Sequence, residues 1–72
     1  MITATEIGKR IRSSREKLNI SPEAFCDDVK ISRSALSMYE NGNRIPRDEV
    51  KIRIARRLGM SIEAIFFANK IT

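Results

Sequence analysis

The chain has 72 residues, which allows one small domain and leaves no room for a catalytic domain beside a binding domain. Fourteen Lys and Arg residues against nine Asp and Glu residues give a formal net charge of +5, which favours an anionic partner such as nucleic acid. One cysteine and no histidine exclude an internal disulfide and leave no basis for a structural zinc site, so we expect no metal and no cofactor.

The first helix is predicted to begin after Thr3 or Thr5, because either hydroxyl can cap it. Ile7, Ile11 and Leu18 recur at helical spacing and are predicted to face the core, while basic side chains cover the other faces. This N-terminal stretch has no apolar run of signal-peptide length, and no run long enough to span a membrane follows it. We therefore expect a cytoplasmic protein without a membrane partner.

The stretch from Ser21 to Gly42 is predicted to form two short helices joined by a tight turn. Ser21 is a good N-cap for the first of them, whose apolar stripe consists of Phe25, Cys26 and Val29. A thiol on such a stripe is expected to be a buried structural group rather than a reactive one. The acidic pair at positions 27 and 28, near the end of this helix, is interpreted as part of a solvated face.

The second helix of this pair has Ser32 as its N-cap and Leu36 and Tyr39 on its inner face. Its outward residues are then Arg33, Ser34, Ser37 and Met38. Two helices of this length with so short a turn fit the geometry in which the second helix enters the DNA major groove. Positive charge also flanks this pair: residues 21–42 carry two basic and four acidic side chains, whereas both flanks are basic.

The order of these residues resembles the Cro/repressor (Xre-type) helix-turn-helix family. The matching positions are Arg15, Ser21, Phe25, Ile31, Ser32, Leu36, Tyr39, Glu40, Gly42, Pro46, Ile54-Ala55 and Leu58-Gly59. The resemblance extends from about Ile7 to Phe66. It departs from the family pattern at Pro22 in place of Gln, at Cys26 in place of Ala, and at Lys30 in place of the Gly of the turn.

The resemblance implies an all-α bundle of five short helices, with residues 1–72 forming a single lambda-repressor-like domain and residues 21–42 forming its reading unit. It also implies an ion pair between Arg15 and Glu40, which would tie the first helix to the end of the reading helix. The alternative for Arg15 is a solvated surface arginine.

The expected base-contacting residues are Arg33, Ser34, Ser37 and Met38. Of these, Arg33 is suited to a bidentate contact with guanine O6 and N7, although a phosphate contact or solvation are the alternatives. Partial packing is the alternative for Met38. The residues expected to contact the DNA backbone are Ser21, Ser32, Asn41, Asn43, Arg44 and Arg47. Pro22 lacks both the side chain and the amide that the family Gln offers to a phosphate.

The last two helices are predicted on either side of Gly59, which ends the fourth. The fourth helix opens at Arg47 or Asp48, has a core face of Val50, Ile54, Ala55 and Leu58, and carries a solvated basic surface of Lys51, Arg53, Arg56 and Arg57. Ser61 caps the fifth, whose core residues are Ile62, Ile65 and Phe66. Met60, Phe67 and Ile71 exceed what this core needs and suggest a dimer interface, although a tail folded back on its own core explains them almost as well.

These features together predict a sequence-specific regulator of transcription that binds double-stranded DNA. We expect a homodimer on a near-palindromic operator, acting as a repressor or as a Cro- or controller-like switch, with no small-molecule ligand. The alternative is a helical protein-interaction module, such as an antitoxin or inhibitor, whose main partner is a protein. An enzyme is not expected, because the chain has no His, no paired catalytic carboxylates and no activated nucleophile.

Overall fold

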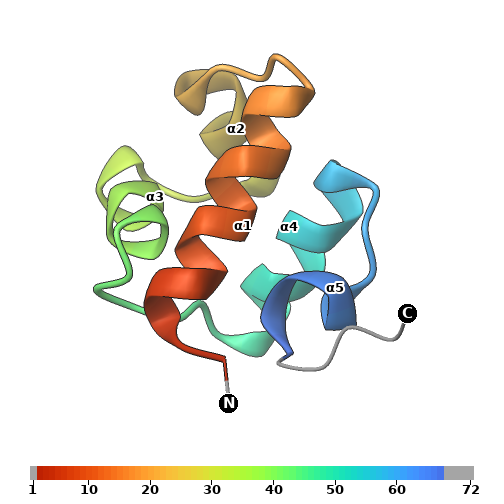
Figure 1. Cartoon of the computed structure of the whole chain (residues 1–72). Coiled ribbons are helices and arrows are strands. Elements are labelled where there is room, and N and C mark those ends of the chain that lie inside the picture. The colour runs from red at the N-terminus through yellow and green to blue at the C-terminus, as the bar shows by residue number, and fades with distance from the viewer. Residues whose placement is uncertain (1, 68–72) are drawn as a thin grey trace.

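Five α-helices and no strand make up residues 2–67, the part of the chain that the computed structural model describes. The helices are α1 (Ala4–Lys17), α2 (Pro22–Val29), α3 (Arg33–Glu40), α4 (Asp48–Leu58) and α5 (Ile62–Phe66). α1 runs through the middle of the bundle, with α3 on one side of it and α4 and α5 on the other (Figure 1). This arrangement confirms the prediction of an all-α bundle of five short helices.

Hydroxyl side chains cap the N-termini of four of these helices. Thr3 Oγ1 accepts a hydrogen bond from the amide of Glu6 at 3.1 Å, so Thr3 rather than Thr5 caps α1. Ser21, Ser32 and Ser61 cap α2, α3 and α5 in the same way, each accepting from the amide three residues ahead. α4 begins after Arg47 without a side-chain cap, and its first turn is acidic instead.

Residues with positive φ end two of the helices, and others follow α1 and α3. Gly59 (φ +66°) ends α4, and Gly42 (φ +79°) follows α3, as expected for glycine. Lys30 ends α2 with φ +65°, a conformation that is unfavourable for a residue with a Cβ atom. The turn between α2 and α3 therefore keeps the left-handed geometry that suits glycine, although the sequence supplies a lysine.

All five helices contribute to one apolar core. Its fully enclosed members include Ile11, Phe25, Val29, Leu36, Ile54 and Ile65. The prediction that Leu18 faces this core is wrong, because half of its surface is exposed. α1 ends at Lys17, and the chain then reverses through Asn19 at φ +58°, so Ile20 becomes buried in place of Leu18.

α1 and α3 approach each other closely at Gly8. A Cβ atom added there would lie 2.5 Å from the backbone oxygens of both Tyr39 and Glu40. Any side chain would therefore push α1 away from the C-terminal end of α3. The absence of a side chain at this one position sets how deeply the two helices pack.

Candidate nucleic-acid interface

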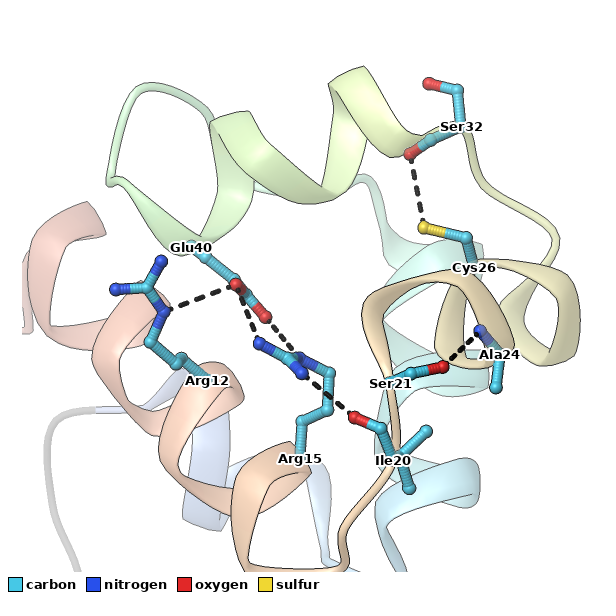
Figure 2. Close-up of polar contacts among 8 residues, drawn as sticks. All are labelled: Arg12, Arg15, Ile20, Ser21, Ala24, Cys26, Ser32 and Glu40. Carbon is cyan, nitrogen blue, oxygen red and sulfur yellow. Dashed lines mark hydrogen bonds and ion pairs between the residues drawn. The ribbon is translucent and has the colours of Figure 1, made fainter.

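The turn between α2 and α3 is held by hydrogen bonds back to α2. The amides of Lys30 and Ile31 both donate to the carbonyl of Cys26, at 2.8 and 3.1 Å. The Cys26 thiol in turn donates to the carbonyl of Ser32 at 3.6 Å (Figure 2). α2 and α3 are therefore joined by a turn with its own polar contacts, and the start of α3 is fixed relative to α2.

α3 presents a polar outer face to solvent and an apolar inner face to the core. Leu36 and Tyr39 are buried beneath it. The four expected base-contacting residues share the opposite face: Arg33, Ser34 and Ser37 are exposed, and Met38 is half-buried. The arrangement leaves one long basic side chain and two hydroxyls available to a ligand along the first turns of this helix.

Arg15 lies beneath the C-terminal end of α3 and forms a two-pronged ion pair with Glu40. Its Nε donates to Glu40 Oε2 at 2.8 Å and its Nη2 donates to Oε1 at 3.3 Å, with both side chains less than a tenth exposed. Its Nη1 donates to the carbonyl of Ile20 at 2.9 Å (Figure 2). The more exposed Arg12 approaches Glu40 Oε1 at 3.5 Å. This network connects α1 to the last residue of α3.

The hydrogen bond to Glu40 raises the pKa of Arg15, and burial acts against that rise. Burial raises the pKa of the Cys26 thiol, while the nearby Arg33 guanidinium acts against that rise. Arg33 also lies close to Glu23 of α2. An exposed ion pair joins Arg33 Nε to Glu23 Oε2 at 3.8 Å.

The residues expected to contact the DNA backbone lie at the ends of α2 and α3 and in the following loop. Ser21 and Ser32 are exposed and accept cap hydrogen bonds, so each hydroxyl still has a proton to donate. The others are also exposed: Asn41, Asn43, Arg44 and Arg47. Asn41 donates to Ser37 Oγ at 3.2 Å. The loop is anchored by an amide hydrogen bond from Asn43 to the carbonyl of Met38 at 2.9 Å.

The acidic residues of the reading unit are mostly paired. Besides Glu23 and Glu40, Asp28 accepts from Arg57 Nε at 2.6 Å in an exposed ion pair, and Asp27 and Asp28 both lie on an exposed face, as interpreted from the sequence. The expectation of a solvated basic surface on α4 is corrected at Arg53, which is partly buried and whose Nε donates to the carbonyl of Val29 at 2.7 Å, whereas Arg56 and Arg57 are exposed as expected. Both contacts join segments more than twenty residues apart, and no local pattern in the sequence points to them.

The residues expected at a dimer interface have different surroundings. Met60 is partly buried against the core, and its sulfur accepts a hydrogen bond from Ser14 Oγ at 3.1 Å. Phe67 is about half exposed (49%). Ile71 lies outside the described residues. Three further apolar side chains that the sequence analysis did not single out for an interface are exposed to a similar degree: Leu18, Ile45 and Ile52.

Residues 2–67 hold no group of three or more His, Cys, Asp or Glu side chains that could bind a metal ion. None of the helices in that range has both the length and the apolar character needed to cross a bilayer.

Comparison with known proteins places this geometry among helix-turn-helix proteins. A family model described as helix-turn-helix matches residues 11–65. The crystal structure of the P22 c2 repressor protein, solved with the synthetic operator 9T, is 30% identical with a TM-score of 0.79, over 82% of this chain and 89% of that one. No curated protein matches the chain.

Two further structures share the fold at lower identity. The restriction-modification controller protein C.AhdI from Aeromonas hydrophila is 22% identical with a TM-score of 0.81, over 88% of this chain and 96% of that one. The clp gene regulator ClgR from C. glutamicum is 20% identical with a TM-score of 0.79, over 90% of this chain and 84% of that one.

Proposed function

Because the chain belongs to the helix-turn-helix family of DNA-binding transcriptional regulators, we propose that it binds a near-palindromic operator as a homodimer and acts there as a repressor or a controller-like switch. Its family and fold are those of DNA-binding regulators rather than of enzymes. The similar P22 c2 repressor was crystallised on a synthetic operator, which supports duplex DNA as the ligand.

The exposed face of α3 is the observation that carries this proposal. α3 is held from behind by the Arg15–Glu40 ion pair, so its outer face is presented in one orientation. In the major groove, the N-terminal turns of this helix would meet the base edges. There Arg33 can donate two hydrogen bonds to one guanine, while Ser34 and Ser37 can donate or accept with less selectivity. Met38 supplies an apolar surface for a thymine methyl group.

The phosphate contacts are assigned to the groups on either side of α3. The hydroxyls of Ser21 and Ser32 lie at the positive ends of two helices, where anions bind favourably. Arg44 and Arg47 are the exposed cations of the loop that follows α3. Contacts of this kind set the register on the duplex and make binding sensitive to salt.

A homodimer would place two copies of α3 in successive major grooves, about 34 Å apart. The exposed Phe67, with Met60 beside the core and Ile71 beyond the described residues, forms the proposed contact between copies. A two-fold axis through such a contact matches an inverted-repeat operator.

The test is selection from random duplex DNA by the wild-type chain, followed by affinity measurements against salt for the selected site. We expect an inverted repeat and a log–log slope of about −0.9 for each phosphate contacted. Arg33→Ala should relax base preference at one position of each half-site by about fivefold or more. Arg56→Ala, which removes an exposed arginine from α4, is the matched control and should keep the preference.

No enriched sequence, together with only weak salt-sensitive binding, would contradict the proposal. The helix-turn-helix would then act as a scaffold, and the ligand to identify would be another protein.

A further inference from the structure

We propose that Glu23 is a specificity-determining positioning residue, which holds the Arg33 guanidinium for base reading and disfavours binding to non-specific duplex. This inference rests on the function proposed above, because it concerns how the same face discriminates among DNA sequences. Glu23 is an acidic residue on the face that is proposed to bind DNA, where an unpaired carboxylate would only weaken binding.

The Glu23 carboxylate approaches the Arg33 guanidinium at Nε. Glu23 Oε2 lies 3.8 Å from Arg33 Nε, the guanidinium nitrogen nearest the backbone. The closest contact with Glu23 is made by Nε and not by either of the two terminal nitrogens of Arg33. These are the groups that can form a forked contact with O6 and N7 of guanine. Glu23 can therefore restrain the side chain without occupying the atoms that read the base.

The backbone that carries this pair is held at both ends. Glu23 lies in the first turn of α2, behind the Ser21 cap, and Arg33 opens α3, behind the Ser32 cap. The turn between the helices is bonded back to Cys26. Only side-chain torsions remain free, so a carboxylate at position 23 narrows the range of directions that the guanidinium can adopt.

Both partners are more than half exposed, so the pair adds little to folding stability. Its effect is expected in binding instead. Glu23 offsets the charge of Arg33 where the protein would first approach phosphates, which weakens binding to any sequence. When Arg33 meets its guanine, the same contact has already reduced the side-chain freedom that binding would remove. Loss of the carboxylate should therefore raise non-specific affinity and lower discrimination at the same time.

Glu63 provides a matched control within the chain. It follows the Ser61 cap of α5 at the same position that Glu23 has after Ser21, and it is exposed. Glu63→Gln and Glu23→Gln change the net charge equally and remove the same favourable interaction with a helix N-terminus. Only Glu23→Gln removes a carboxylate that approaches Arg33. A difference between the two variants therefore reports on the pair rather than on charge or helix stability.

The first measurement needs no DNA and follows the side-chain Nε–Hε group of Arg33 by NMR relaxation in the folded chain. Glu23→Gln should lower the order parameter of this group, and Glu63→Gln should leave it unchanged. Equal Arg33 mobility in the wild type and in Glu23→Gln would overturn the inference whether or not the chain binds DNA.

The second measurement compares affinity for the selected site, for that site changed at the base read by Arg33, and for an unrelated duplex of equal length. Glu23→Gln should reduce discrimination at that base about twofold to fivefold while raising affinity for the unrelated duplex by a similar factor. Glu63→Gln should preserve the discrimination. Unchanged discrimination in Glu23→Gln, where Arg33→Ala abolishes it, would overturn the role of Glu23 alone. A wild-type chain that selects no site would instead overturn the proposed function.

Discussion

At the scale of single residues, Arg15 carries a charged side chain that is almost fully buried, as is the side chain of its partner Glu40. Such burial is tolerated because each nitrogen of its guanidinium has an acceptor, two on Glu40 and one on the backbone of Ile20. The hydrogen bond to Glu40 raises the pKa of Arg15, so the contribution of the protonated guanidinium to stability is present below the ordinary arginine value and is lost only as pH rises through the higher folded value. The pair is therefore constant around neutral pH.

Arg15→Ala is expected to lower the free energy of unfolding by about 3 kcal/mol, because it leaves the buried Glu40 carboxylate without its main partner. Arg12→Ala, which removes the exposed and more distant arginine, should cost less than about 1 kcal/mol. Denaturant unfolding measures both values. Arg15→Ala should also weaken DNA binding, since the end of α3 loses its anchor. Unchanged melting and unchanged DNA affinity in this variant would disprove the role given to the pair.

At the scale of elements, α2, α3 and α5 each begin directly after the serine that was predicted to cap them. The end of α2 differs, because its last residue adopts a backbone conformation that its residue type disfavours. Lys30 adopts the left-handed conformation that the chain needs in order to turn from α2 into α3. The amides of Lys30 and Ile31 bond to Cys26 in this geometry. The tertiary requirement that α3 pack across α2 outweighs the preference of a lysine for negative φ.

Lys30→Gly is expected to raise the free energy of unfolding by about 0.5 kcal/mol. Relief of about 1–2 kcal/mol of left-handed strain exceeds about 0.4–1 kcal/mol of added freedom in the unfolded chain. Gly59→Ala, at nearly the same φ with open space around the new Cβ atom, should lower stability by a similar amount. Denaturant unfolding of both variants checks the pair. A loss of stability in Lys30→Gly would show that the lysine side chain contributes more than its backbone costs.

At the scale of the whole molecule, long arginines join helices that are distant in sequence. Arg10 on α1 donates from Nη1 to the carbonyls of Ala64, Ile65 and Phe67, at 3.0 to 3.4 Å, around the end of α5. α5 has only five residues and would not be stable alone. Two buried side chains, Ile65 and Phe66, and this one guanidinium hold it against the bundle.

Arg10→Ala should therefore loosen α5 before the rest of the fold. We expect the amides of α5 to lose about tenfold or more of their protection against hydrogen exchange, since hydrogen bonds from a charged donor contribute about 1.5–3 kcal/mol. The amides of α2 and α3 should keep theirs. Arg56→Ala, on the exposed side of α4, is the control. Equal protection of α5 in the wild type and in Arg10→Ala would show that apolar burial alone holds this helix.

Much of this protein could be predicted from local signals. Three serine caps, the apolar stripe of α2 and the glycine after α4 gave the right helices, because capping and helical periodicity act within a few residues. Leu18 was assigned to the core by spacing alone, and this failed because α1 ends one residue earlier. The identity of the outward residues of α3 followed from the same periodicity that buried Leu36 and Tyr39.

Contacts between segments that are distant in sequence could be identified only from the tertiary structure. Two such charged groups interact only after the fold has brought them together. The family resemblance suggested Arg15 with Glu40, but nothing in the sequence indicated Arg57 with Asp28 or Arg10 with the end of α5. The pair of Glu23 with Arg33 likewise required the turn at Lys30, which brings the first turns of α2 and α3 together. Sequence by itself determined which helices form and which faces they bury, and the packed structure decided which charges meet.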